Sequence, residues 1–263
     1  MKRLIHLGCS FAVGNAIPHY IQDLPDNIAP AVHNPVKKFV KDAITKFKIE
    51  IKDRITCGNW LANKLNLGFK NYGENGQSND AVFRKLLAID LTETFVLIGI
   101  TGGNRREGLT TRNRRQHWHT YKMVGPSTDP GYKDISFNPW VNKSGIQEYT
   151  PALEEEEQMR VLLQIIYMQN YLKANNVPYL MFHALYNGFD KPLTDESKAY
   201  ANKVDEKNFY KFRGTFDECQ HGYCLKEGLT VSNYDEHPNV QGQKKWGGML
   251  LEQALEIKKN ASR

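Results

Sequence analysis

Short, continuous apolar runs alternate along this chain with longer stretches whose apolar residues recur every three or four positions. The runs at 4–7, 94–101 and 177–183 have the length and composition of strands that are covered on both faces of a parallel sheet. A weaker run begins at Phe69, directly before a glycine-rich segment. All of them are far shorter than a membrane span, which needs about 20 apolar residues. The pattern therefore predicts a buried sheet of short strands.

Helical spacing of apolar residues separates these runs. It predicts helices over 36–55, 60–65, 81–89 and 151–175, and a terminal helix that follows Gly242. Strands that alternate with helices are typical of a parallel α/β sheet. Ligands of such sheets bind outside the carboxyl ends of the strands, so the residues that follow each strand are the candidates for function.

The segment from Gly108 to Gly145 is polar, aromatic and rich in arginine, and its pattern is irregular. A loop of this length inside a domain is often a lid or a binding loop. We therefore expect a single domain over 1–263 with a long insertion loop at about 105–150. Residues 209–233 are too mixed in pattern for any element to be predicted.

Bulk composition adds few constraints. Hydrophobic residues make up 40% and charged residues 24% of the 263 positions, as in ordinary soluble proteins. The formal net charge of +6 is too mild to indicate nucleic-acid binding by itself. Polar residues interrupt the first apolar run, so no signal peptide and a cytoplasmic location are expected. Cys219 and Cys224, with His221 between them, lack a second ligand pair, so paired or free thiols are favoured over a metal site, and no cofactor is expected.

Two groups of residues carry candidate chemistry. Ser10 follows the first strand, where a serine is either a nucleophile beside a helix end or only the N-cap of that helix. Asp235 and His237 combine an imidazole with a carboxylate that can orient it, which is the pair that a nucleophilic serine needs. A purely structural contact between Asp235 and His237 is the alternative. Neither group decides the function when it is taken alone.

Taken together, these segments resemble the conserved blocks of the SGNH (GDSL-like) hydrolases. Gly8-Cys9-Ser10-Phe11 is similar to the block that carries the nucleophile, and Asn71-x-Gly73-x-x-Gly76-x-Ser78 to the block that supplies a backbone donor. Gly102-Gly103-Asn104 fits the third block, and Asp235-x-His237-Pro238-Asn239 resembles the last block. The blocks follow one another in the family's order from end to end of the chain.

The resemblance implies a three-layer α/β/α sandwich with a central parallel sheet, which is the flavodoxin-like fold of SGNH hydrolases. It implies a serine esterase or deacetylase in which Ser10 attacks an ester carbonyl, His237 accepts the proton and Asp235 orients the imidazole. The aromatic loop at 108–145 makes an O-acetylated glycan the favoured substrate, although its interleaved basic and aromatic residues suit sugar rings and single-stranded nucleic acid equally well. The expected partner is thus a small-molecule or glycan ester, and neither nucleic acid nor a membrane is expected.

The resemblance also assigns an oxyanion hole. Its donors are the backbone N–H groups of Ser10 and Gly76 and the side chain of Asn104, with Thr101 as the runner-up when the motif is counted along the strand. The residues expected to contact the substrate are Arg105, Glu107 and His183.

The chain departs from the family pattern in two places: in the third block, where Gly99-Ile100-Thr101 is the alternative match when the motif is counted along the strand, and in the last block. The family usually separates its Asp and His by two residues, whereas only Glu236 lies between Asp235 and His237. The motifs also resemble hydrolase-like proteins of bacteriophages, which implies the host cytoplasm or the virion as the location. A noncatalytic structural or binding protein on the same fold, virion-associated or bound to nucleic acid, is the rival hypothesis.

Overall fold

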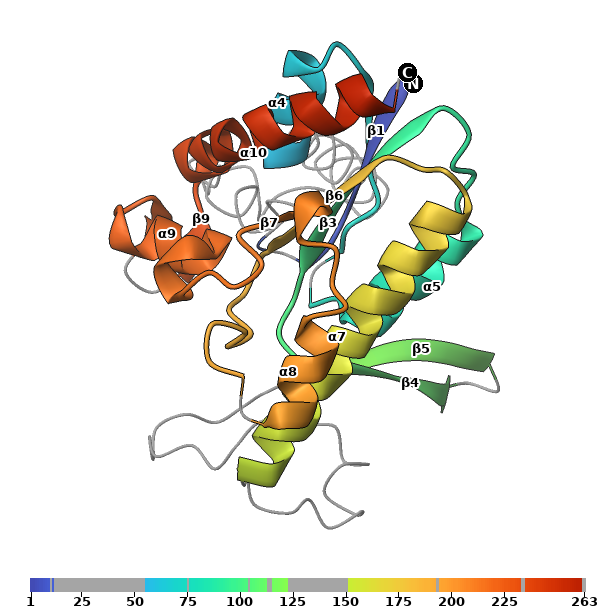
Figure 1. Ribbon diagram of the computed structural model, residues 1–263, viewed down its shortest axis with the longest axis vertical. Helices are drawn as coiled ribbons and strands as arrows, with labels where there is room; N and C mark the ends of the chain where they lie inside the picture. Colours follow the sequence, from blue (N-terminus) through green and yellow to red (C-terminus); the bar gives the residue numbers. More distant parts are fainter. Residues whose placement is uncertain are drawn as a thin grey trace, which may run out of the picture.

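The computed structural model describes residues 1–9, 11, 55–74, 76–103, 105–112, 115–122, 151–192, 194–232 and 235–261. Within these residues the central sheet has five strands, in the order β2-β1-β3-β6-β7, and every neighbouring pair is parallel (Figure 1). The strands are β1 (Arg3–Leu7), β2 (Gly68–Asn71), β3 (Thr94–Ile100), β6 (Tyr179–His183) and β7 (Phe209–Tyr210). Counted along the chain this order is 2-1-3-4-5, the flavodoxin-like doubly wound arrangement. The strand order reverses between β1 and β3, so the expected ligand crevice lies outside the carboxyl ends of these two strands.

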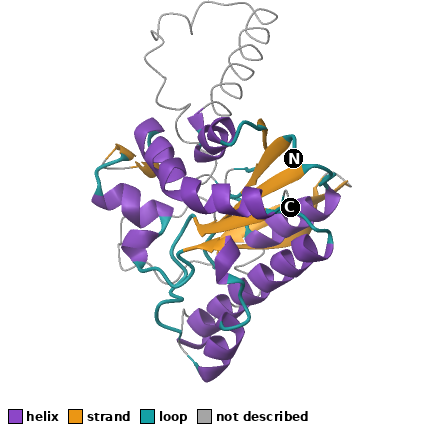
Figure 2. Ribbon diagram, turned by 45° about the horizontal axis from the view of Figure 1, so that its top comes forward, coloured by secondary structure: helices purple, strands orange, loops and turns teal. Residues whose placement is uncertain are grey.

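Helices cover both faces of the sheet (Figure 2). One face packs against α4 (Cys57–Lys64) and α10 (Val240–Asn260). The other packs against α5 (Asn79–Ala88), α7 (Pro151–Ala174) and α8 (Asp195–Ala201). The predicted three-layer α/β/α sandwich with a central parallel sheet is therefore confirmed.

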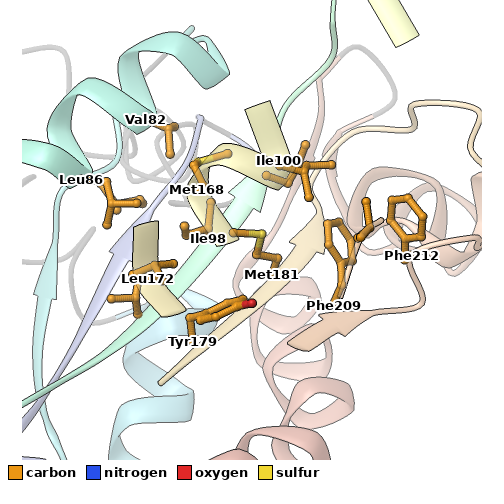
Figure 3. Packing of buried hydrophobic residues seen from close by; sticks show 14 of the residues in the cluster. Val82, Leu86, Ile98, Ile100, Met168, Leu172, Tyr179, Met181, Phe209 and Phe212 are labelled. Atoms are coloured by element: carbon orange, nitrogen blue, oxygen red, sulfur yellow. The ribbon is translucent and has the colours of Figure 1, made fainter. Parts of the chain in front are cut away.

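Alternation along the strands divides the core between these two faces. Ile98 of β3 packs with Val82 and Leu86 of α5 and with Met168 and Leu172 of α7, as Figure 3 shows. The flanking residues of β3 point the opposite way. Phe95 and Leu97 pack in a second cluster with Leu61 of α4 and with Trp246 and Leu250 of α10. Since side chains on both faces are excluded from water, the near-continuous apolar composition of these strands is required.

The strands and helices expected within the described residues are confirmed, with bounds shifted by a few residues. The predicted helix over 36–55 lies outside the described residues, apart from position 55. The 105–150 region differs from the irregular loop that was expected, because β4 (Arg105–Arg112) and β5 (Arg115–Lys122) form an antiparallel hairpin. The remaining residues of that region lie outside the described chain up to the start of α7.

The unassigned segment near the C-terminus holds several short elements. They are η3 (Phe216–Glu218), α9 (Gln220–Lys226) and β8 (Thr230–Ser232), and β8 pairs antiparallel with β9 (Asp235–Pro238). Among the residues that the structure describes, no helix is both long and apolar enough to cross a membrane.

Candidate active site

Asp235 and His237 lie in contact on β9. The Asp235 Oδ1 atom is 2.5 Å from His237 Nδ1 and also accepts a hydrogen bond from the His237 backbone N–H at 3.0 Å. Successive side chains of a strand alternate between its faces, so residues two apart share one face. This is why one intervening residue suffices here. The motif lies on a strand, β9.

Asn239 fixes the end of β9 to its neighbours. Its side chain accepts from the Gly242 backbone N–H at 2.8 Å, which caps α10, and donates to the Thr230 carbonyl of β8 at 3.0 Å. Its backbone N–H donates to the Leu229 carbonyl at 2.9 Å. His237 therefore lies two residues before the N-cap of α10, which is itself anchored by hydrogen bonds.

Phe11 brings the turn after β1 to His237. Its ring stacks on the His237 imidazole with 4.2 Å between the ring centroids. Its carbonyl accepts a 2.8 Å hydrogen bond from the side chain of Gln243, whose own carbonyl oxygen accepts from the Cys57 backbone N–H at 3.0 Å. Gln243 is fully buried in α10, and it also lies 3.3 Å from the amide of Gln220. One buried glutamine thus joins this turn to α4, α9 and α10.

Sequence reasoning missed Gln243, although a signal was present. It precedes Trp246, Leu250 and Ala254 on the buried stripe of α10, and a polar residue on such a stripe needs partners inside the protein.

A second histidine–carboxylate pair flanks Phe11. His221 Nε2 lies 2.7 Å from the Glu236 carboxylate, and the His221 ring meets Phe11 edge-on with 4.9 Å between centroids. Sequence reasoning treated His221 only as a metal-ligand candidate. A strand at this motif would have indicated the pair, because side chains alternate along a strand and Glu236 must therefore face away from its neighbours Asp235 and His237.

The glycine-rich loop after β2 lies against the turn after β1. The Glu74 backbone N–H donates to the Gly8 carbonyl at 3.2 Å, which continues the pairing of the two strands past their ends. Gly76 has φ +70°, in the left-handed region that favours glycine, and a Cβ placed there would meet no atom within 4 Å. Ser78 caps α5 by accepting from the Ala81 N–H at 3.2 Å.

The segment after β3 is held by α5 and α7. Asn79 and Thr101 exchange two hydrogen bonds of 2.9 and 3.0 Å through the Asn79 side chain and the Thr101 backbone. A Cβ on Gly103 would lie 2.7 Å from the Glu157 carbonyl of α7, so only glycine fits at this close approach. The Thr101 hydroxyl is buried and has no hydrogen-bond partner within the described residues.

The remaining predicted site residues have different outcomes. Ser10 and Asn104 lie outside the described residues, as does the side chain of Glu107. Arg105 begins β4, and one of its guanidinium nitrogens is buried without a partner in the described part of the chain.

His183 needs a correction, because it belongs to the core rather than to a substrate surface. It is 5% exposed, and its Nε2 lies 2.9 Å from the Phe212 carbonyl. Its ring is packed among those of Phe189, Phe209 and Phe212. Burial lowers the pKa of His183 to about 4, so the ring is neutral at physiological pH.

A cavity of about 500 Å³ lies at the opposite edge of the sheet. Its lining includes Met1, Glu93, Thr94 and Pro178, which adjoin the amino ends of the strands. It is therefore not part of the candidate active site. The described residues hold no cluster of three or more His, Cys, Asp or Glu side chains suited to a metal ion.

Several solved structures resemble this chain, although no family model and no curated protein matches its sequence. One is a protein from Desulfitobacterium hafniense DCB-2 assigned to the G-D-S-L family of lipolytic proteins, with 10% identity, TM-score 0.39, and coverage of 96% of this chain and 99% of the other. A second is the psychrotrophic esterase EstA from Pseudoalteromonas sp., with 11% identity and TM-score 0.40. The match covers 99% of this chain and 98% of the esterase chain. A third is a family 2 carbohydrate esterase with a carbohydrate-binding domain from Corynascus thermopiles, with 11% identity and TM-score 0.43. The match covers 98% of this chain and 67% of the other chain. Fold likeness does not define an activity, which depends on the residues at the site.

Proposed function

We propose that this protein is a serine ester hydrolase of the SGNH type, with Ser10 as nucleophile, His237 as base and Asp235 as the group that orients the base. The observation that carries the proposal is the 2.5 Å contact between Asp235 and His237 directly beside Phe11, the covalent neighbour of Ser10. A carboxylate on Nδ1 fixes the tautomer whose other nitrogen, Nε2, accepts a proton. These parts come from opposite ends of the chain.

In the proposed reaction, Ser10 Oγ bonds to the carbonyl carbon of the ester and its proton passes to His237 Nε2. The resulting oxyanion is bound by the N–H groups of Ser10 and Gly76 and by Asn104, with Thr101 as the alternative donor. Collapse of this intermediate breaks the bond to the alcohol, which leaves with the proton from His237. A water molecule, activated in turn by His237, then releases the acid and restores Ser10.

The left-handed conformation of Gly76 supports its place in this scheme. A glycine with φ +70° and open space around its Cβ position presents its backbone without a side chain in the way. Its loop is hydrogen-bonded to Gly8, two residues before the proposed nucleophile. Removing one oxyanion donor typically costs about 100- to 1000-fold in rate.

The substrate that we favour is an O-acetylated glycan, with Arg105 and Glu107 as groups beside the ester. The kinship with bacteriophage proteins stays a prediction from the sequence.

Labelling by a fluorophosphonate probe tests the nucleophile. We expect the folded protein to react at Ser10, identified by mass spectrometry of the labelled peptide, and the Ser10→Ala, His237→Ala and denatured proteins to remain unlabelled. Hydrolysis of a short acyl ester should fall at least about 1000-fold in Ser10→Ala. Equal hydrolysis by wild type and Ser10→Ala, or a folded protein that the probe does not label, contradicts the proposal and favours a noncatalytic protein.

A further inference from the structure

Two exposed aromatic rings are connected to the candidate base by an unbroken row of ring contacts. Tyr186 and Phe216 are 36% and 38% exposed, and they meet edge-on with 6.0 Å between centroids. Phe216 meets His221 edge-on at 5.5 Å, and His221 meets Phe11 at 4.9 Å. Phe11 in turn stacks on His237. The row leads from solvent to the proposed catalytic histidine.

The row stands at the carboxyl edge of the sheet, where ligands of this fold bind. Tyr186 is three residues beyond the end of β6, and the His221 backbone N–H donates to the Ala184 carbonyl at 3.2 Å. The start of α9 is thereby hydrogen-bonded to the segment that follows β6. The exposed rings and the candidate base thus lie on the same side of the fold.

The structure holds both exposed rings in place. Phe216 begins η3, whose backbone is tied by a 3.1 Å hydrogen bond from the Thr215 N–H to the Glu218 carboxylate. A Cβ on Gly222 would lie 2.0 Å from the Phe216 carbonyl, so the first turn of α9 packs directly on this residue. The Tyr186 hydroxyl donates to Asp190 at 2.5 Å. Rings that are ordered in advance lose little conformational entropy when a ligand binds.

Carboxylates beside the rings select the chemistry of the ligand. Asp190 accepts from Tyr186 and is partly exposed, and the side chain of Glu236, bound to His221, is 53% exposed. A ring face carries a slight negative charge that attracts the C–H groups of a sugar. The carboxylates accept hydrogen bonds from hydroxyl groups. An aliphatic chain offers no donor to these carboxylates, and a phosphate group is repelled by them.

We propose that Tyr186 and Phe216 form a binding platform for the sugar ring in the alcohol half of an ester substrate. This inference depends on the proposed function, in which His237 returns its proton to the departing alcohol. Groups on the His237 side of the site therefore face the alcohol rather than the acyl group. Tyr186 and Phe216 set specificity through KM and take no part in the bond-breaking steps.

Two acetate esters that differ only in their alcohol test this platform. An acetylated methyl glucoside and propyl acetate share the acyl group. In Phe216→Ala and Tyr186→Ala we expect KM for the glucoside ester to rise about 10-fold with kcat within 2-fold of wild type, a change of about 1.4 kcal/mol in binding. The kcat/KM for propyl acetate should stay within 2-fold. Tyr186→Phe keeps the ring and should raise KM less than Tyr186→Ala.

Tyr167→Ala is the matched control. Tyr167 is 54% exposed and belongs to α7, which packs on one face of the sheet. Its removal should change the kinetics of neither ester. Thermal unfolding of each variant shows whether it is folded. An equal loss on both esters in folded Phe216→Ala and Tyr186→Ala overturns the platform, because the rings would then act on the base through His221. Unchanged KM for the glucoside ester overturns it as well.

Saturation-transfer NMR with unacetylated methyl glucoside separates this inference from the proposed function, since it needs no hydrolysis. Binding that is lost in Phe216→Ala and Tyr186→Ala but kept in Tyr167→Ala supports the platform, even if Ser10→Ala hydrolyses esters as fast as wild type. Absence of sugar binding in a wild-type protein that hydrolyses propyl acetate overturns the platform and leaves the proposed function standing.

Discussion

The ring of Phe11 lies on the imidazole of His237, with 4.2 Å between the ring centroids and 23° between the ring planes. This contact joins the turn after the first strand of the sheet to a strand close to the C-terminus. The Gln243 side chain donates a 2.8 Å hydrogen bond to the Phe11 carbonyl. The proposed nucleophile and base are therefore linked through one stacked pair.

Asp235→Asn should lower kcat for ester hydrolysis by about 100- to 10,000-fold with little change in KM. The amide can still accept from the His237 backbone N–H, but it no longer stabilises the imidazolium that forms when the serine proton is taken up. Steady-state kinetics on a short acyl ester measure the effect. Asp217→Asn is the control, since Asp217 pairs with Lys226 on the surface. A kcat within 3-fold of wild type in Asp235→Asn would remove Asp235 from the mechanism.

Gly76→Ala and Gly228→Ala form a matched pair. The two glycines have φ +70° and +65°, and a Cβ on either one meets no atom within 4 Å. Both substitutions should destabilise the protein by about 1–2 kcal/mol, through the left-handed backbone alone. Only Gly76→Ala should also reduce kcat, by at least about 10-fold, because it disturbs a proposed oxyanion donor. Urea unfolding and ester kinetics on both variants measure the two effects. Equal kcat values in the two variants would exclude Gly76 from the oxyanion hole.

Gln243→Leu should lower the free energy of unfolding by about 2–4 kcal/mol. The substitution leaves the buried Cys57 N–H and Phe11 carbonyl without their partner. Gln253→Leu is the control on the same helix. Gln253 donates to the Lys207 carbonyl at an exposed position, and its loss should cost no more than about 0.5 kcal/mol. Urea unfolding at neutral pH compares them, and similar costs for the two variants would show that the buried bonds contribute no more than the exposed one.

The buried imidazole of His183 should make the protein less stable in mild acid. Burial lowers its folded pKa to about 4, while an unfolded histidine titrates near 6.5. Below pH 6.5 the His183 imidazole binds a proton in the unfolded chain but stays neutral in the folded chain. The stability that the neutral imidazole contributes is therefore present above about pH 6.5 and is lost as the pH falls towards 4.

Urea unfolding at pH 7 and pH 5 measures this effect. His183 should account for a loss of about 2 kcal/mol between the two values. His183→Gln removes the titrating group. The free energy of unfolding of this variant should therefore fall less between the two pH values than that of wild type, and the difference should equal the contribution of His183. Equal pH dependence in wild type and His183→Gln would show that this imidazole does not carry the effect.

Periodicity was sufficient for most of the sheet and its helices. The runs around Ile5, Ile98 and Met181 are buried on both faces, and continuous apolar character reports that environment directly. The hairpin at 105–122 and the elements between Phe209 and Ser232 were not predicted. Strands of two or three residues are too short to show a period, and the hairpin strands are rich in charged residues.

The sequence by itself determined the local features of this protein: the longer apolar strands of the central sheet, the helix caps at Ser78 and Asn239, and the candidate groups after these strands. These follow from hydrophobic period and from hydrogen bonds between near neighbours in the chain. Only the tertiary structure decided that Phe11 meets His237, that Glu236 pairs with His221, and that His183 is buried among phenylalanine rings. Contacts between distant segments depend on how helices and strands pack, and no local pattern encodes that packing.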